Sequence, residues 1–120
     1  MSGKYIDSFI IPVPAANLER YKEHSAKAAA VWREHGALQY EEWVAEDVQP
    51  GKLTSFPQAV QLKDDETIVM GFAVYESRAE RDRVFGAVMA DPRMAEMMQG
   101  GMPFDGSRMI FGGFAQLAAD

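Results

Sequence analysis

Asp7 and His24 are the two side chains whose type and position in the sequence could support acid–base chemistry. Asp7 interrupts an otherwise apolar segment, where burial would make an unpaired carboxylate costly. In a pocket, either side chain could act as a general base. The alternative for Asp7 is a structural pairing, with an arginine such as Arg108 or with Asp7 of a second copy. We favour that structural interpretation for Asp7 and a surface position for His24.

The two histidines, His24 and His35, do not form a metal-binding pair. They lie eleven residues apart in one predicted helix, and eleven residues of helix rise by about 16 Å. The sequence has no cysteine and no His-x-x-x-His spacing, so the common zinc patterns are missing. We therefore expect no metal and no bound cofactor, with His35 at a helix end where it favours the helix dipole.

A methionine-rich segment, residues 89–102, could form an adaptable lid over an apolar ligand. Methionine is flexible and suits irregular apolar pockets, although ordinary gap filling in a core is the alternative that we favour. Three glycines within predicted strands, Gly71, Gly112 and Gly113, indicate a bulge, close packing or space for a ligand. The candidate ligand-binding residues are Trp43, Phe56, Met94, Met98, Phe104 and Arg108.

The elements that position these side chains follow the order strand, helix, strand, strand, helix, strand. The strands are expected at 4–13, 38–45, 67–75 and 108–117, the main helices at 17–35 and 77–90, and shorter helices at 55–62 and 91–100. Ser77 and Glu80 have the spacing of a capping box. This order is typical of the ferredoxin-like α+β fold. It predicts a single domain, 1–120, whose first and third strands occupy the middle of a four-stranded antiparallel sheet.

The central strands are apolar on both faces, as Phe9 and Ile11 on one side and Ile6 and Ile10 on the other illustrate. A sheet with one face in water should instead alternate apolar and polar residues. The two crossover helices of this topology cover only one face. We therefore expect a homodimer that packs sheet to sheet. The alternative is that the Phe56 segment and residues 94–102 cap the sheet within one chain.

Composition excludes several classes of partner. The chain has 120 residues, with 12 basic and 18 acidic side chains and a net charge of -6. Binding to nucleic acid or to an anionic membrane needs a concentrated positive surface, and Arg78, Arg81 and Arg83 alternate with Glu80 and Asp82 on what should be a solvated helix face. Without an apolar segment of membrane-spanning length or a signal-like start, we expect a cytoplasmic protein.

Several motifs along most of the chain resemble the YbaA-like family of small bacterial proteins of unknown function. They are Tyr-Ile-Asp-Ser-Phe at 5–9, Pro-Gly-Lys at 50–52, Thr-Ser-Phe-Pro at 54–57, Asp-Pro-Arg-Met at 91–94, Met-Pro-Phe-Asp-Gly at 102–106 and Arg-Met-Ile-Phe-Gly-Gly-Phe at 108–114. Phe111 departs from the pattern, because relatives are expected to have tyrosine there. The resemblance implies the dimeric α/β-barrel superfamily, which includes cofactor-free monooxygenases, haem-dependent enzymes and lactone isomerases. It supplies no catalytic residues to transfer.

Three functional hypotheses remain from the sequence. The first is a homodimer that binds a small apolar or aromatic molecule between sheet and helices. The second is a cofactor-independent monooxygenase or isomerase that uses Asp7 or His24 as its base. The third is a dimeric scaffold with no ligand.

Overall fold

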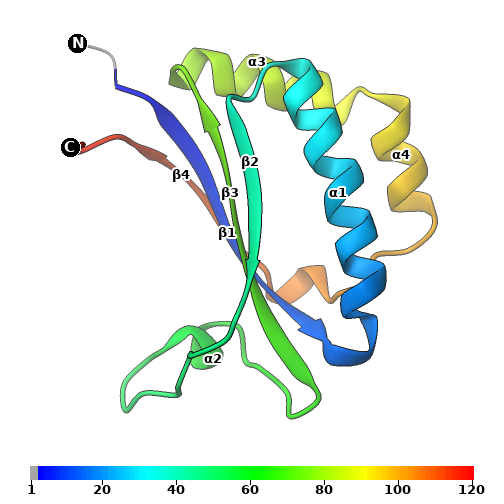
Figure 1. The fold of residues 1–120 in the computed structure, drawn as a ribbon, viewed down its shortest axis with the longest axis vertical. Helices are drawn as coiled ribbons and strands as arrows, with labels where there is room; N and C mark the ends of the chain where they lie inside the picture. The colour runs from blue at the N-terminus through cyan, green and yellow to red at the C-terminus, as the bar shows by residue number, and fades with distance from the viewer. Residues whose placement is uncertain (1–2) are drawn as a thin grey trace.

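The computed structural model describes residues 3–120 and has the expected order of elements (Figure 1). The elements are β1 (Tyr5–Pro14), α1 (Leu18–His35), β2 (Gln39–Val44), α2 (Phe56–Ala59), β3 (Glu66–Tyr75), α3 (Arg78–Met89), α4 (Pro92–Gln99) and β4 (Ile110–Ala115), with single turns of 3-10 helix at Ala15–Asn17 and Gly106–Arg108. The sheet has the order β2-β3-β1-β4, and all neighbouring strands are antiparallel. The ferredoxin-like α+β fold and the central position of the first and third strands are confirmed.

The last strand is shorter than the sequence pattern predicts. The strand was expected at 108–117, but Arg108 belongs to a 3-10 turn, Gly106–Arg108, and β4 spans only Ile110–Ala115. The Asp105 carboxylate causes this turn, because it accepts a hydrogen bond from the Ser107 backbone N–H at 3.0 Å. An aspartate that caps its own following turn competes with strand formation.

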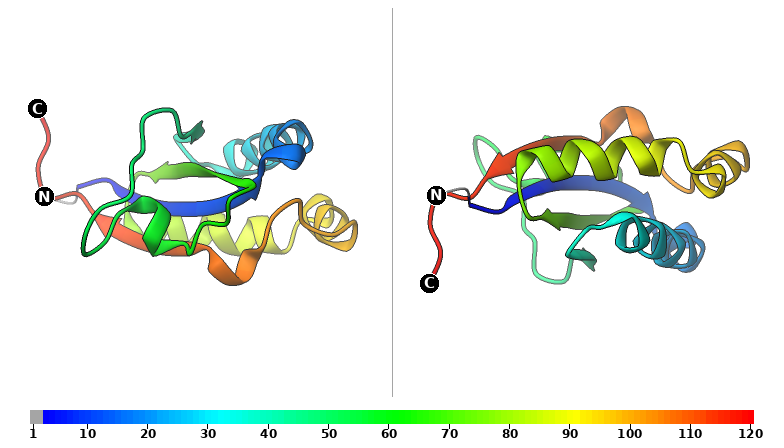
Figure 2. Two further views of the ribbon diagram at one scale, coloured as in Figure 1. Left: turned by 90° about the horizontal axis from the view of Figure 1, so that it is seen from below. Right: turned by 90° about the horizontal axis from the view of Figure 1, so that it is seen from above.

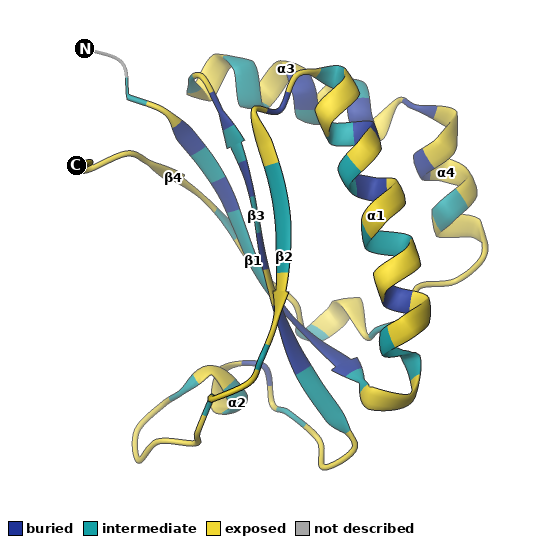
Figure 3. Cartoon of the chain, in the orientation of Figure 1, coloured by how far each residue is buried: buried dark blue, intermediate teal, exposed yellow. Residues whose placement is uncertain are grey.

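Helices α1 and α3 lie against one face of the sheet, and α4 packs beside α1 on the same side (Figures 1 and 2). The core forms where these helices meet the central strands. Its fully buried members include Tyr75, Val84 and Val88, and Val31 contributes from α1. Figure 3 shows this burial along the middle strands and on the inner sides of the helices. No helix of residues 3–120 is long and apolar enough to cross a membrane.

The other face of the sheet has no helix across it within the described residues (Figure 2). Trp43, Met70, Ile10 and Ile110 lie in register there and make an apolar row across all four strands. Of these, Trp43 is 59% exposed and Met70 is 40% exposed. We call this surface the open face. Its apolar character confirms that the central strands are apolar on both sides.

The segments considered as an intrachain cap do not cover the open face. Residues 94–102 lie on the opposite, helical side of the sheet (Figure 1). Helix α2 reaches only the end of the open face, where Phe56 borders a small pocket of about 200 Å³ together with Trp43 and Met70. Most of this apolar surface therefore has no cover within the described chain.

Gly71 in β3 is required by close packing, and its replacement is expected to destabilise the fold. A Cβ atom at this position would overlap the ring of Phe9 from β1. Gly71→Ala should therefore reduce the free energy of unfolding by about 1–3 kcal/mol, as overpacking of a core does. Gly86→Ala is the matched control, because a Cβ there meets nothing within 4 Å and alanine favours a helix interior by about 1 kcal/mol. Urea unfolding of both variants measures the difference, and equal stabilities would contradict the packing role of Gly71.

Candidate ligand cavity

A cavity of about 450 Å³ lies between the helical side of the sheet and α1, α3 and α4. This volume falls within the range of about 300–1,000 Å³ that small-molecule sites occupy. Aromatic, methionine and alanine side chains make up most of its lining, with few polar groups. The lining residues are Asp7, Phe9, Ile11, Tyr21, His24, Ala28, Trp32, Tyr40, Glu42, Ala73, Phe85, Met89, Met94, Met98, Met102, Phe104, Gly106, Met109 and Phe111.

Strand register explains how the polar groups come to lie on the floor of the cavity. Asp7 of β1 is paired with Ala73 of β3, and Tyr40 of β2 is paired with the same alanine. Glu42 lies two residues beyond Tyr40, so it points to the same side of the sheet. The small side chain of Ala73 separates Asp7 from Tyr40 and leaves space above the central strands.

The methionine-rich segment forms one wall of this cavity. Met94 and Met98 line it from α4, which begins where the Asp91 carboxylate accepts a hydrogen bond from the Arg93 backbone N–H at 2.9 Å. Met94 is buried, whereas Met98 is mostly exposed at the edge. The helix ends before Gly101, whose φ of 79° favours glycine. The segment therefore lies beside the cavity, a position that fits both the lid hypothesis and ordinary filling of the core.

An ionic network fastens the beginning of α4 to α1. His35 and Arg93 each contact the Asp91 carboxylate at 2.8 Å, and Arg93 also donates to Glu34 at 2.7 Å. The Arg93 guanidinium and the His35 ring hold the pKa of Asp91 well below its usual range. His35 is therefore at a helix end, as expected, but it interacts with a specific carboxylate there.

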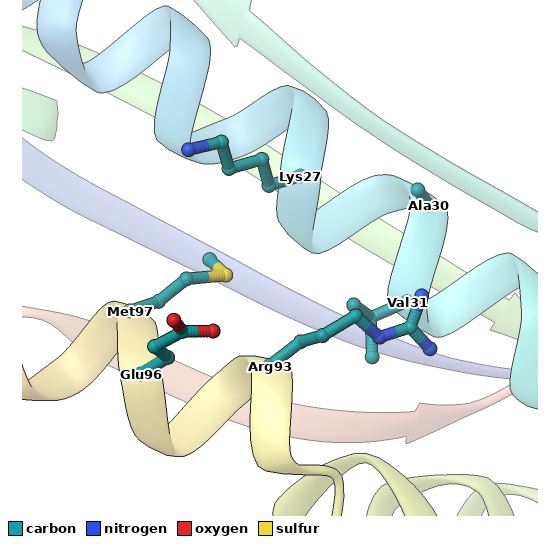
Figure 4. A pocket seen from close by; sticks show the side chains of 6 residues that line it. All are labelled: Lys27, Ala30, Val31, Arg93, Glu96 and Met97. Atoms are coloured by element: carbon teal, nitrogen blue, oxygen red, sulfur yellow. The ribbon is translucent and has the colours of Figure 1, made fainter.

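A second groove, between α1 and α4, is a weaker candidate for a ligand site (Figure 4). Its volume is about 470 Å³, and Lys27, Arg93 and Glu96 bring both signs of charge to it. Arg93 is already engaged by Asp91 and Glu34. The cavity beside the sheet has the more apolar lining, so we take it as the candidate site.

Asp7 is buried, with only 3% of its surface exposed. Its Oδ2 accepts a hydrogen bond from the Tyr75 hydroxyl at 3.0 Å, and the Tyr75 oxygen accepts one from Trp32 Nε1 at 3.0 Å. Desolvation by burial raises the pKa of Asp7, against the lowering effects of Tyr75 and Arg81. The carboxylate is therefore held in place by a chain of aromatic donors at the floor of the cavity.

The arginine beside Asp7 is Arg81, which corrects two expectations. Arg81 Nε lies 3.3 Å from Asp7 Oδ1, and its guanidinium donates to the Tyr5 hydroxyl at 3.2 Å. Its side chain is only 20% exposed, so it does not belong to a solvated helix face. The absence of a side chain at Gly113 of β4 leaves room for the contact between Arg81 and Tyr5, because a Cβ there would overlap both side chains.

Arg108, which the sequence suggested as a partner of Asp7, lies outside the cavity. It contacts the Glu66 carboxylate at 2.5 Å and that of Asp105 at 2.8 Å. The hydrogen bonds from Arg108 lower the pKa of Glu66. These contacts connect the turn before β4 to the beginning of β3, and Arg108 has a structural role there.

Glu42 is a cavity residue that sequence reasoning missed. Its carboxylate accepts hydrogen bonds from the hydroxyl groups of Tyr21, Ser25 and Tyr40, the last at 3.1 Å. Burial, followed by the Glu42 charge, raises the pKa of both tyrosines, so they remain hydrogen-bond donors. The adjacent Glu41 points the other way and accepts from Trp43 Nε1 at 3.2 Å. The sequence does contain a signal for this position: Glu42 lies two residues after Tyr40, and alternate residues of a strand point to the same face.

His24 is half-buried in α1 and lines the cavity, although a surface position was expected. Its ring lies 6.1 Å from that of Tyr21, centroid to centroid. Desolvation lowers the pKa of His24 below its usual value, which favours the neutral imidazole. Within residues 3–120, no cluster of histidine and acidic side chains is arranged to hold a metal ion.

The structure brings together some of the candidate residues and separates others. Asp7, His24, Met94, Met98 and Phe104 all line the cavity, as does Phe111. Two further candidates, Trp43 and Phe56, line the small pocket at the open face instead. The cavity beneath the helices, which most of these candidates line, is therefore the candidate site.

Comparison with known proteins places the chain among bacterial proteins of unknown function. Residues 4–106 match the family model described as "Protein of unknown function (DUF1428)". The "Uncharacterized protein YbaA" of Escherichia coli (strain K12) is 44% identical over 114 residues, which cover 95% of this chain and 97% of that protein. The protein of the same name from Shigella flexneri has the same identity and coverage. The resemblance noted in the sequence is confirmed.

Solved structures share the fold at low sequence identity. SnoaB, a cofactor-independent oxygenase from Streptomyces nogalater, has a TM-score of 0.62 at 14% identity, with 98% of this chain and 97% of that one covered. A putative antibiotic biosynthesis monooxygenase from Nitrosomonas europaea has a TM-score of 0.58 at 11% identity, covering 98% and 93%. A dimeric ferredoxin-like protein from an uncultured marine organism has a TM-score of 0.60 at 11% identity, covering 98% and 99%. At these identities the likeness concerns the fold alone.

Proposed function

This chain belongs to the DUF1428 family of proteins of unknown function. Since the family supplies no activity, we propose a function from the structure: the chain binds a small apolar or aromatic molecule in the cavity. The observation that carries the proposal is the cavity itself: about 450 Å³ of space with a mostly aromatic and methionine lining. Asp7, His24 and Glu42 are the ionisable exceptions. An apolar enclosure with a few oriented polar groups is the usual composition of a small-molecule site.

Calorimetric titration with 1-methoxynaphthalene tests this proposal. The probe is flat and apolar, and it has no hydroxyl group to donate. We expect saturable binding of one molecule per chain, with a dissociation constant on the order of tens of micromolar for a ligand of this size. The heat capacity of binding should be negative, because apolar surface is buried. Absence of saturable heat would contradict the proposal and favour a scaffold without a ligand.

A cofactor-independent oxygenase or isomerase is the second candidate function. It is favoured by the presence of two groups suited to proton transfer, Asp7 and a neutral His24, in the lining of one cavity. Proteins named as oxygenase and monooxygenase share the fold, although a fold does not determine an activity. With a substrate identified, the base is the residue whose replacement, Asp7→Asn or His24→Ala, abolishes turnover but preserves affinity. Full turnover in both variants would exclude this assignment.

We further propose that two chains pair through their open faces. The apolar row of Trp43, Met70, Ile10 and Ile110 is the kind of exposed patch that marks an interface. A second copy of the same sheet supplies a surface of matching chemistry. The name of one structural neighbour describes it as a dimeric ferredoxin-like protein. Such pairing leaves the cavity, on the other side of the sheet, available to a ligand.

A further inference from the structure

We propose that the cavity selects an organic cation, a protonated amine or a quaternary ammonium group on an apolar or aromatic body, with the Glu42 carboxylate as its counter-charge. This inference rests on the proposed binding function and narrows the class of ligand. It makes Glu42, which sequence reasoning missed, the residue that decides which sign of charge the cavity accepts.

The charged side chains that line the cavity are carboxylates. Among the described residues of its lining, Asp7 and Glu42 are acidic, and none is a lysine or an arginine. His24 is the other ionisable group with a nitrogen, and desolvation lowers its pKa despite the opposing charge of Glu42. Its ring is therefore mostly neutral at pH 7. The lining thus carries negative charge without a fixed positive charge.

The two carboxylates differ in how their charge is balanced. Arg81 Nε lies 3.3 Å from Asp7 Oδ1 and forms an ion pair with it. Glu42 accepts hydrogen bonds from three neutral hydroxyl groups, and within residues 3–120 it forms no ion pair with a lysine, arginine or histidine. A carboxylate that only accepts hydrogen bonds is in its ionised form. Glu42 therefore brings an unpaired negative charge to an apolar cavity, where charges are usually paired.

A ligand in the cavity comes within range of this charge. Glu42 is only half-buried, and it lines the cavity. Attraction between opposite charges acts over several ångströms in apolar surroundings, so a cation does not have to displace the hydroxyl groups that already donate to Glu42. Arg20 and Lys27 of α1 also act on His24, but both are exposed to solvent, which screens their repulsion of a cation.

Aromatic rings flank the Glu42 carboxylate. Tyr21 and Tyr40 donate their hydroxyl groups to it, which holds both rings beside the charge. The Phe104 ring lies 5.6 Å from that of Tyr21, and the Trp32 ring lies 5.2 Å from that of Tyr40, centroid to centroid. All four rings line the cavity. Aromatic rings attract cations through their quadrupoles, and groups of such rings recognise quaternary ammonium ligands.

The test compares two probes of the same shape, phenyltrimethylammonium and tert-butylbenzene, in which a carbon atom takes the place of the charged nitrogen. In calorimetric titration of the unchanged protein we expect the cation to bind about ten-fold more tightly. Glu42→Gln should remove most of this preference by weakening the binding of the cation alone. Glu41→Gln is the matched control, because it removes the same charge from the neighbouring residue, whose side chain contacts Trp43 on the other face of β2; it should retain the preference.

Each outcome bears on a different claim. If neither these probes nor 1-methoxynaphthalene bind the unchanged protein, the proposed function fails. If tert-butylbenzene binds as tightly as the cation, the cavity binds ligands but does not select a cation. The role of Glu42 is wrong if its replacement affects the preference no more than Glu41→Gln does. Should Glu42→Gln not fold, benzenesulfonate replaces the variant: we expect no saturable binding of this anion to the unchanged protein, and an affinity equal to that of the cation would overturn the inference.

Discussion

Replacing Met70 by aspartate is expected to dissociate the protein into monomers at concentrations where the unchanged chain is dimeric. Met70 lies on β3 in the apolar row of the open face, in register with Ile10 and Trp43. Pairing two such faces would bury a carboxylate from each chain without a partner, at a cost of several kcal/mol. The dissociation constant of the dimer should rise by at least about a thousand-fold, which sedimentation equilibrium can measure.

Leu38→Asp is the control for this experiment. Leu38 is 39% exposed and Met70 is 40% exposed, so the two substitutions add the same charge to equally accessible apolar sites. Leu38, however, lies just before β2 and outside the apolar row. We expect Leu38→Asp to remain dimeric. A monomeric unchanged protein, or a dimeric Met70→Asp variant, would contradict pairing through the open face.

Ala28→Trp is expected to abolish binding of 1-methoxynaphthalene while the protein remains folded. Ala28 is a buried residue of α1 that lines the cavity. An indole ring at this position would occupy the space that the probe needs, so no saturable heat should remain at probe concentrations that saturate the unchanged protein. Overpacking costs about 1–3 kcal/mol, so thermal unfolding of the variant should be measured alongside binding.

Ala26→Trp controls for the bulk of the indole on the same helix. Ala26 is exposed to solvent and is not among the cavity residues. Its replacement should leave the affinity for the probe unchanged. If Ala28→Trp binds as tightly as Ala26→Trp, the probe occupies another part of the molecule. The small pocket bordered by Trp43 and Phe56 would then be the first alternative.

The fold could be predicted because the helix-capping residues and the order of the elements indicate the same topology. Ser77 does cap α3, accepting a hydrogen bond from the Glu80 backbone N–H at 3.1 Å, and Asp91 with Pro92 begins α4 as their types suggest. The order of elements then admits few topologies. The exception is the beginning of β4, because Arg108, expected as the first residue of the strand, belongs to the turn that Asp105 caps.

The candidate site was only partly predictable, because side-chain direction depends on tertiary packing. Trp43 and Phe104 were equally plausible from composition, yet strand register turns Trp43 to the open face, and Phe104 packs edge-on against Tyr21 at 5.6 Å between centroids. Arg81 looked solvated among neighbouring acids, but the space above Gly113 lets it turn inward to Asp7. No local pattern encodes such a contact between distant segments.

The most direct test of the binding proposal is NMR of the methionine methyl groups as 1-methoxynaphthalene is added. Met89, Met94, Met98, Met102 and Met109 line the cavity, whereas Met70 lies on the open face and serves as an internal reference. A bound aromatic ring should shift the methyl signals of cavity methionines, above all Met94 and Met98, in a saturable way and leave Met70 unchanged. Saturable shifts confined to Met70, or no saturable shifts at all, would contradict a ligand site beneath the helices.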